Sequence, residues 1–329
     1  MEAIVSDSGI SKDVYTVGED FAGGVTKVTV RNRQTGASFS VVPEFGGNVC
    51  ELVLKGGGRL HSVVRGYVQR DDFLHDNTYR NWHLIPFPNR IRNGVYTFQG
   101  RYFQLPVNEI DRNNAHHGFF GRRSLAVGKS DVTESGSALR FSYAYTGDVP
   151  GYPFPFEVLL TYVLGASNGF MCSTEIRNTG SGPMPVGYGW HPYYTIGASI
   201  DELHLKLPTT SQVELDERMI PTGVVSSNEE FQEFSSLHDV RLDAVYKIES
   251  SGGISFVELY HQELAVGIRL WQETGRGKFG YLCAYTAPSR DSIAIEPMTC
   301  NVDAFNNGDG LIVLGKGESF AARCGVSML

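Results

Sequence analysis

The chain has 329 residues, a formal net charge of −8 at pH 7, and lysines and arginines that are scattered along its length. An acidic chain without a basic run lacks the electrostatic footprint that nucleic acid requires, so we expect no nucleic-acid partner. The first residues do not combine a basic start with an apolar stretch, and no apolar run approaches the length of a membrane span. We therefore expect no membrane association and a cytoplasmic location.

Composition favours an all-β protein. Glycine accounts for 38 residues, tyrosine for 16 and phenylalanine for 19, which is typical of many short strands joined by tight turns. The hydrophobic share of 41% is sufficient for a substantial core. No linker, low-complexity tract or repeat divides the chain, so we expect one domain over residues 1–329, with residues 1–24 as a peripheral N-terminal extension.

Period-two alternation and short β-branched or aromatic runs recur from end to end, whereas helical periodicity is weak. These segments predict a large antiparallel β-sandwich. One short helix is expected at residues 229–237, and a charged, aromatic stretch at residues 69–82 predicts a long loop over one end of the sheets. In chain order, the expected strands are residues 26–31, 39–42, 49–54, 95–98, 102–105, 139–145, 156–164, 170–177, 203–207, 255–260, 264–271, 279–286, 292–295, 310–314 and 319–325.

Two features that suggest other functions can be set aside. Residues 275–280 match G-x-G-x-x-G but lead into a predicted strand, so a dinucleotide would find no helix N-terminus for its pyrophosphate. The cysteines are odd in number, widely spaced and without a C-x-x-C motif, which predicts buried reduced thiols and no disulfide framework or thiolate metal site. They are Cys50, Cys172, Cys283, Cys300 and Cys324.

The first candidate site is a polar pair on a stiff segment. Two prolines precede Asn89 and Arg90, and Gly94 then releases the backbone into a strand. A guanidinium can donate two parallel hydrogen bonds to neighbouring hydroxyl groups, and an amide can both donate and accept. The pair is therefore suited to holding a polyhydroxylated ligand, although a surface turn containing an arginine is an equally simple interpretation.

Two histidines and a glutamate form the second candidate site. His117 precedes Gly118, which suits a turn where another group approaches the backbone, and His191 is followed by Pro192 and Tyr193. Aromatic faces of this kind pack against the C–H surface of sugar rings. Glu296 ends an apolar run, so its charge lies in a pocket or needs a partner. An imidazole and a carboxylate can act as acid and base, although each could also be a structural residue.

Metal ligation and a further carboxylate complete the candidates. His116 and His117 have no third ligand nearby in sequence and lack metal-motif spacing, so a metal site would require partners distant in sequence, and we expect none. Asp243 is a weak candidate by itself, because most such aspartates are solvated or cap turns.

The ordered set of motifs resembles the aldose 1-epimerase family, which is galactose mutarotase-like, over nearly the whole chain from about residue 25. The motifs that carry the resemblance are Asn89-Arg90-Ile91 with Gly94, Tyr102 to Leu105, His117-Gly118, Gly151 to Phe154, His191-Pro192-Tyr193, Glu296-Pro297, Asp303 to Asn306 and Gly317-Glu318.

The resemblance implies a β-sandwich enzyme that interconverts the α and β anomers of a free aldose without a metal or organic cofactor. Glu296 would be the general base at the C1 hydroxyl and His191 the general acid at the ring oxygen. His117 would support the ring-oxygen or neighbouring hydroxyl side, and Asn89, Arg90 and Asp243 would hold the sugar hydroxyls. Tyr193 is a further substrate-binding candidate, as an aromatic face for the sugar ring. Phe119 and Cys283 differ from the residues of galactose mutarotases, so the identity of the sugar stays open.

Three other functions fit parts of this pattern. A hexose-6-phosphate 1-epimerase would need at least two arginines to converge on one end of the pocket, from Arg80, Arg92, Arg112, Arg122 and Arg123. A non-catalytic sugar-binding or sensing protein could use the same fold, but would not need both His191 and Glu296. A glycosidase would place Asp243 and Glu296 on either side of a glycosidic oxygen. We expect a small sugar as the partner and a monomer or homodimer as the assembly.

Overall fold

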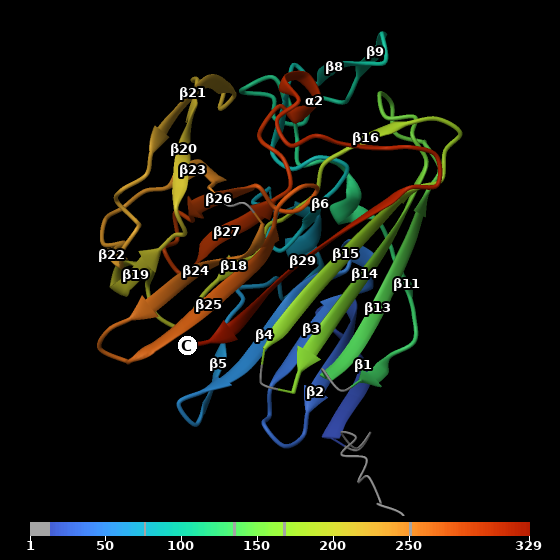
Figure 1. Ribbon diagram of the computed structural model, residues 1–329. Helices are drawn as coiled ribbons and strands as arrows, with labels where there is room; N and C mark the ends of the chain where they lie inside the picture. Colours follow the sequence, from blue (N-terminus) through green and yellow to red (C-terminus); the bar gives the residue numbers. More distant parts are fainter. Residues whose placement is uncertain (1–13, 76, 134–135, 167–168, 250–251) are drawn as a thin grey trace, which may run out of the picture.

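The computed structural model describes residues 14–75, 77–133, 136–166, 169–249 and 252–329. Within these residues the molecule is built from antiparallel sheets that pack face to face (Figure 1). The first sheet is a five-stranded meander in sequence order. Its strands are β1 (Tyr15–Ala22), β2 (Val25–Asn32), β3 (Ser38–Val42), β4 (Asn48–Gly56) and β5 (Arg59–Ser62).

The ten-stranded sheet forms the broad centre of the molecule, and both β2 and β4 of the first sheet contact its strands. Alternate side chains of its strand β14 are buried, as expected for a strand with one face on the core. In spatial order the strands are β11 (Ala126–Val127), β13 (Gly136–Tyr145), β14 (Phe156–Gly165), β15 (Phe170–Asn178), β29 (Ser319–Met328), β25 (Val266–Thr274), β24 (Gly253–His261), β19 (Leu203–Lys206) and β22 (Ser235–Ser236), with β12 (Asp131–Thr133) paired to β13.

The eight-stranded sheet carries most of the candidate site. In spatial order its strands are β21 (Pro221–Ser227), β20 (Thr210–Leu215), β23 (Asp243–Ile248), β26 (Tyr281–Thr286), β27 (Ile293–Met298), β17 (Gly189–Trp190) and β6 (His83–Leu84), with β18 (Tyr193–Tyr194) paired to β27. Strand β27 is buried along its whole length, which explains its apolar sequence around Glu296.

The remaining elements are short. Three two-stranded ribbons join β7 (Arg90–Arg92) to β10 (Asn114–His116), β8 (Val95–Phe98) to β9 (Arg101–Gln104), and β16 (Met184–Val186) to β28 (Ile312–Leu314). The helices are α1 (Arg70–His75), α2 (Ala304–Asn307), and the 3₁₀ turns η2 (Pro43–Phe45), η3 (Phe120–Arg122) and η4 (Ile200–Glu202). None of the described helices has the length and apolar character needed to span a bilayer.

The predicted antiparallel all-β fold is confirmed, and each of the expected strands overlaps an observed one. The five cysteines are free and buried, also as predicted. Residues 275–280 form the turn between β25 and β26, without a helix. Of the expected N-terminal extension, residues 1–13 lie outside the described residues, whereas residues 15–22 form the edge strand β1 with a buried Tyr15.

The helix expected at residues 229–237 is wrong. This segment lies along β19, because the Leu207 N–H donates to the Phe231 carbonyl and the Leu237 N–H donates to the Leu203 carbonyl. Both Phe231 and Leu237 are buried, so the segment is anchored by side chains at its ends while its backbone groups are used by the sheet.

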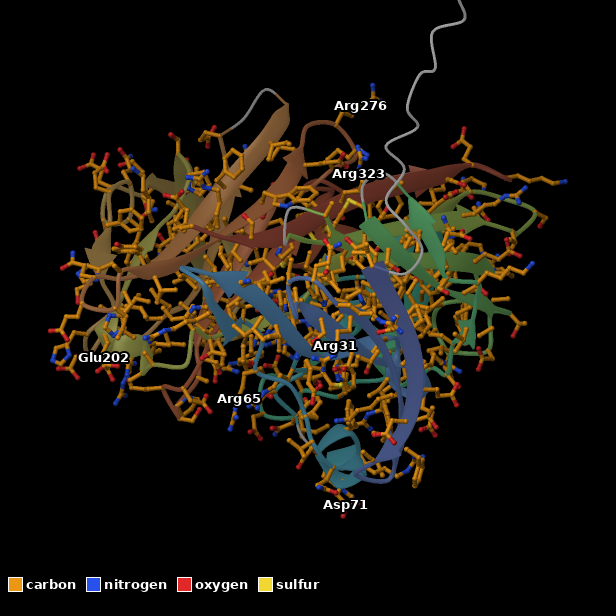
Figure 2. All side chains as sticks on the ribbon, turned by 90° about the horizontal axis from the view of Figure 1, so that it is seen from below. Arg31, Arg65, Asp71, Glu202, Arg276 and Arg323 are labelled. Atoms are coloured by element: carbon orange, nitrogen blue, oxygen red, sulfur yellow. The ribbon has the colours of Figure 1, made fainter. Side chains whose placement is uncertain are left out.

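The loop expected at residues 69–82 contains one short helix, α1. The Asp72 carboxylate accepts hydrogen bonds from the Val68 and Gln69 N–H groups, and Phe73 stacks on Phe45 at 4.8 Å between ring centroids. Asp71 of this helix points outward at the rim of the molecule in Figure 2. The helix therefore forms where a capping aspartate and one buried aromatic side chain coincide.

Candidate active site

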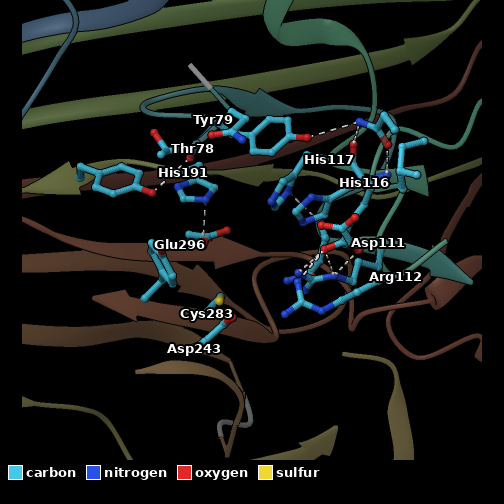
Figure 3. Close-up of a pocket in the computed structure, with 18 residues that line it drawn as sticks. Thr78, Tyr79, Asp111, Arg112, His116, His117, His191, Asp243, Cys283 and Glu296 are labelled. Atoms are coloured by element: carbon cyan, nitrogen blue, oxygen red, sulfur yellow. Dashed lines mark hydrogen bonds and ion pairs between the residues drawn. The ribbon is translucent and has the colours of Figure 1, made fainter. Parts of the chain in front are cut away.

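A cavity of about 580 Å³ opens over the eight-stranded sheet and is shown in Figure 3. Its floor comes from adjacent strands, because Glu296 of β27 lies opposite Cys283 of β26, and Asp243 of β23 lies opposite Tyr285 of β26. Directly opposed residues point to the same face of a sheet, and residues two apart on one strand do so as well. The register therefore gathers these four side chains on the face that lines the cavity.

One wall is a pair of tight turns that hold Asn89 and His117 against each other. Both residues adopt left-handed backbone conformations, with φ of 56° and 59°. The His117 N–H donates to the Asn89 carbonyl at 2.8 Å, and the Asn89 N–H donates to His117 Nδ1 at 3.1 Å. Gly118 follows with φ of 65°, and a Cβ there would lie 2.2 Å from the Ile85 carbonyl oxygen, so only glycine fits.

This hydrogen bond assigns the tautomer of His117. Because Nδ1 accepts from a backbone N–H, the neutral ring carries its proton on Nε2 and can donate that proton into the cavity. Burial lowers the pKa of His117 well below its usual value, and the neighbouring His116 and His191 lower it further. His117 is therefore a neutral hydrogen-bond donor.

His191 and Glu296 are in direct contact. His191 Nε2 lies 3.2 Å from Glu296 Oε1, and both side chains are buried. The imidazole stacks on the ring of Tyr193 with an interplanar angle of 7°, and the Tyr193 hydroxyl donates to the Thr78 carbonyl. The backbone of His191 is held between Trp82 and Asn81, so the ring has a defined orientation.

The environment of Glu296 keeps a proton on this pair. Burial raises the pKa of Glu296 to about 8, the Cys283 thiol opposes this rise, and the Asp243 carboxylate adds to it. Glu296 Oε2 is buried and has no hydrogen-bond partner among the described residues. The proton can reside on either member, Oε1 of Glu296 or Nε2 of His191, which is the arrangement that an acid and base pair requires.

Arg90 lies beside the His191–Glu296 pair, but most of its hydrogen-bond donors are used by Glu109. Its Nε and Nη2 atoms donate to the Glu109 carboxylate at 2.9 to 3.1 Å, and Nη1 donates to Asn89 Oδ1 at 3.0 Å. The expectation that the Arg90 guanidinium is free to donate two parallel hydrogen bonds to a sugar is therefore corrected. Only the Nη1 side and the outer Nη2 proton remain available. Hydrogen bonds from Arg90 and Asn114 lower the pKa of Glu109 to about 2 against the opposing effect of burial.

Asp243 lines the cavity from the start of strand β23. Its side chain is exposed to the cavity, and desolvation by the surrounding walls raises its pKa. All seven predicted site residues therefore line the same cavity, namely Asn89, Arg90, His117, His191, Tyr193, Asp243 and Glu296.

A metal ion does not fit this cluster well, although His117, His191 and Glu296 offer atoms within 4.8 Å of one another. A metal-bound imidazole donates its other N–H to an acceptor, which fixes the ring. The group behind His117 Nδ1 is instead the Asn89 N–H, a donor. Ligation through Nε2 would move the proton to Nδ1 and set two donors against each other.

Several lining residues were not among the predicted site residues. Tyr79 packs its ring on His117 at 4.6 Å between centroids, and its hydroxyl accepts a hydrogen bond from Asn108. Glu109 and Arg112 also line the cavity and are ion-paired. The charged, aromatic character of residues 69–82 was the available signal for Tyr79, whereas no local pattern distinguishes Glu109 from a surface glutamate.

The arginines considered for a phosphate do not converge. Only Arg112 of the five lines the cavity within the described part of the chain. Arg92 pairs with Asp216 and Arg123 with Asp148. Arg80 lies over the rings of Tyr67 and Tyr193, and Arg122 lies over Trp82.

Comparison with known proteins identifies the class. The model of the aldose 1-epimerase family matches residues 26–327, and the chain belongs to this family of isomerases. Among individual relatives, the uncharacterized protein YihR of Escherichia coli K12 is 31% identical over 242 residues, covering 71% of this chain and 74% of that protein. Galactose mutarotase of Rattus norvegicus is 26% identical over 209 residues, covering 62% of this chain and 58% of that enzyme.

Solved structures share the fold. A galactose mutarotase-like protein from Clostridium acetobutylicum superposes with a TM-score of 0.84 at 19% identity, covering 97% of this chain and 99% of that chain. An aldose epimerase homologue from C. elegans has a TM-score of 0.79 at 17% identity, with 95% and 99% coverage. Structural similarity at these sequence identities supports the galactose mutarotase-like architecture. It does not identify the substrate.

Proposed function

We propose that this protein is a mutarotase that interconverts the α and β anomers of a free aldose. The observation that carries the proposal is the buried contact between His191 Nε2 and Glu296 Oε1 at 3.2 Å on the floor of a cavity. Ring opening requires one proton to be removed from the C1 hydroxyl and one to be delivered to the ring oxygen, and a pair that holds one proton meets both needs.

In the proposed cycle, Glu296 removes the proton from the C1 hydroxyl while His191 protonates the ring oxygen, and the C1–O5 bond breaks. The aldehyde then rotates about C1–C2. For reclosure, His191 takes the proton back from the O5 hydroxyl as O5 attacks the other face of C1, and Glu296 returns its proton to the new C1 hydroxyl. The number of protons on the pair is the same before and after the reaction.

The other residues would hold the sugar during this cycle. The neutral His117 donates its Nε2 proton to the ring oxygen or a neighbouring hydroxyl. Asn89 and the free protons of Arg90 bind hydroxyl groups on one side, and Asp243 accepts from hydroxyl groups on the other. Held contacts of this kind keep the opened chain close to the geometry of reclosure.

The direct test is a panel of freshly dissolved single-anomer aldoses and aldose 6-phosphates, with equilibration followed by polarimetry or NMR. We expect acceleration for at least one free aldose. Preference for a 6-phosphate over the free sugar would favour the hexose-6-phosphate alternative. Sugar binding without acceleration would favour the binding or sensing alternative. Cleavage of a glycoside would favour the glycosidase, which would leave His191 without a function.

Domain organisation, assembly and location enter the proposal as expectations from the sequence. They are one catalytic domain, a monomer or homodimer, and a cytoplasmic site of action on a small sugar. Sedimentation of the purified protein and fractionation of cells test the last two.

A further inference from the structure

Arg80 lies between two aromatic rings and is not among the residues that line the cavity of the candidate active site. Its Cζ is 5.6 Å from the ring centroid of Tyr67 and 5.2 Å from that of Tyr193. Its Nε is buried and has no hydrogen-bond partner in the part of the chain that the structure describes. Aromatic faces attract a guanidinium, most strongly where water is excluded. The two rings therefore hold the Arg80 side chain.

The backbone of Arg80 is fixed by residues that precede it in the chain. Its N–H donates to the Tyr67 hydroxyl at 3.0 Å, and its carbonyl accepts from Asn48 Nδ2 of strand β4 at 2.8 Å. Its neighbours Tyr79 and Asn81 both have left-handed backbone conformations, with φ of 55° and 60°. A backbone constrained at these points leaves the side chain little freedom of direction.

The ring of Tyr193 connects Arg80 to the imidazole of His191. Tyr193 is 1% exposed, and its ring is parallel to that of His191 within 7°, with centroids 5.1 Å apart. The Tyr193 hydroxyl donates to the Thr78 carbonyl at 3.1 Å, and the Tyr193 N–H donates to Asn81 Oδ1 at 3.0 Å. Residues 78–81 therefore hold Tyr193 at its hydroxyl, its ring and its backbone, and a shift of this ring would turn the imidazole stacked on it.

We propose that Arg80 is a positioning residue for the mutarotase reaction. Through the ring of Tyr193, it keeps the His191 imidazole in the orientation in which Nε2 lies 3.2 Å from Glu296 Oε1. Reaction rates are sensitive to such geometry, because a reacting group misplaced by about 1 Å can cost about 10²-fold. This inference rests on the proposed function, because it concerns the orientation of the same acid and base pair.

The first test is Arg80→Gln, which removes the cation and keeps a polar side chain. We expect kcat for the best aldose to fall about 3- to 30-fold, which is the range that a cation–π contact supplies. KM should change little, because Arg80 does not line the cavity whereas His191 acts in the proton exchange.

Arg123→Gln is the matched control. The Arg123 Cζ lies 5.5 Å from the ring centroid of Phe119 and 5.9 Å from that of Tyr145, so this guanidinium is also held between two aromatic rings. The rings recorded in contact with His191 are those of His117 and Tyr193, and Arg123 lies over neither of them. We expect the kcat of Arg123→Gln to equal that of the wild-type protein.

Two further measurements test the route through Tyr193. Tyr193→Leu removes the ring, so adding Arg80→Gln to it should lower kcat little further. The ¹⁵N NMR signals of labelled histidine rings, assigned with His191→Asn, report orientation without turnover. Arg80→Gln should shift the His191 signals, whereas Arg123→Gln should leave them in place.

The outcomes separate the two proposals. Normal kcat in folded Arg80→Gln, an equal loss in Arg123→Gln, or additive losses in the double variant would overturn the positioning role and leave the mutarotase proposal standing. A raised KM with normal kcat would also overturn it, because Arg80 would then contact the sugar. If the wild-type protein equilibrates no aldose, the mutarotase proposal fails. The His191 signals then decide the positioning role alone, and unshifted signals in Arg80→Gln overturn it.

Discussion

At the scale of single residues, the proposed chemistry depends on the contact between His191 and Glu296, which can share one proton. Burial and the nearby Asp243 carboxylate make the ionised form of Glu296 unfavourable, while contact with His191 Nε2 provides a place for the proton. His117 is set apart from this exchange, because the Asn89 N–H occupies its Nδ1. The two histidines thus have different tasks, because His117 is held through Nδ1 by the Asn89 N–H whereas His191 contacts Glu296 through Nε2.

The first prediction is a pH profile. Because the pKa of Glu296 is raised to about 8, the His191–Glu296 pair keeps one proton at neutral pH and loses it as pH rises through about 8. Since the cycle needs that proton, kcat/KM for the best aldose should fall above about pH 8. A profile that continues to rise to pH 10 would contradict a shared proton. Uncatalysed mutarotation, which base accelerates, must be subtracted at each pH.

The second prediction concerns removal of the pair. Glu296→Gln and His191→Asn should each lower kcat about 10²- to 10⁴-fold, the usual contribution of one positioned proton-transfer group. The double variant should be little worse than either single variant, because the two groups act as a unit. His117→Asn should cost less, since His117 donates only a hydrogen bond. Circular dichroism must first show native folding, and near-normal kcat in folded Glu296→Gln would refute the assignment.

The third prediction separates binding from chemistry. Asn89→Ala deletes the side-chain amide that lines the cavity, but keeps the backbone N–H that holds His117. Its contacts persist in the closed and open forms of the sugar, so the change should raise KM with little effect on kcat. Steady-state kinetics over a wide range of substrate concentration provide the measurement. An unchanged KM with abolished kcat would place Asn89 in the chemical step.

At the scale of elements, strand β6 pairs with β17 and stabilises it from inside the core. His83 of β6 is paired with Trp190, the residue before His191, and their rings stack at 5.9 Å. The Tyr162 hydroxyl donates to the Gly47 carbonyl, so His83 Nε2 must donate to Tyr162, and Nδ1 must accept from Tyr188. Every group in this buried chain is satisfied only while His83 is neutral.

The fourth prediction is an acid-dependent loss of stability. Burial lowers the pKa of His83 to about 3, below its unfolded value of 6.5. The unfolded state therefore binds a proton that the folded state refuses, so this contribution is complete above pH 6.5 and declines as pH falls toward 3. Urea titrations from pH 7 to 4 should show uptake of about one more proton on unfolding than in His83→Gln. Equal slopes for the two proteins would refute this account of His83.

At the scale of the whole molecule, the eight-stranded sheet forms the rigid floor of the cavity and loops form its rim. The eight-stranded sheet positions Asp243, Cys283 and Glu296 through its register, whereas Asn89 and His117 come from turns at the same end of the ribbon of β7 and β10. Asp303, ahead of α2, accepts from the Arg92 N–H and steadies that ribbon. The geometry of the candidate site thus depends on contacts between segments that are 211 residues apart.

The fifth prediction is that the purified chain needs no metal. Overnight treatment with EDTA followed by desalting should leave mutarotation of the best aldose unchanged, because the donor behind His117 disfavours ligation at its Nε2. Loss of activity that a divalent ion restores would show that the cluster is a metal site. Metal analysis of the treated protein by mass spectrometry is the control.

The sequence alone determined the parts of this protein that depend on local pattern. Alternation of apolar and polar residues located the long strands, because burial of one sheet face requires period two. The motifs around Asn89, His117, His191 and Glu296 were visible because their glycines, prolines and aromatic residues are local requirements of tight turns and stacked rings. Strands of two or three residues, such as β17 and β18, are too short to produce a pattern of this kind.

Tertiary structure decided which of these residues contact each other and which of their hydrogen-bonding groups remain available to a ligand. Glu109 forms an ion pair with the Arg90 guanidinium. Residues 229–237 form hydrogen bonds beside the neighbouring strand β19 instead of a helix. The contact of Asp243 with Tyr285 in the lining of the cavity arises from the register between β23 and β26, and the two residues are 42 positions apart in the chain. Pairings of this kind depend on the packing of distant segments, and a side chain's free hydrogen bonds are known only when all its neighbours are present.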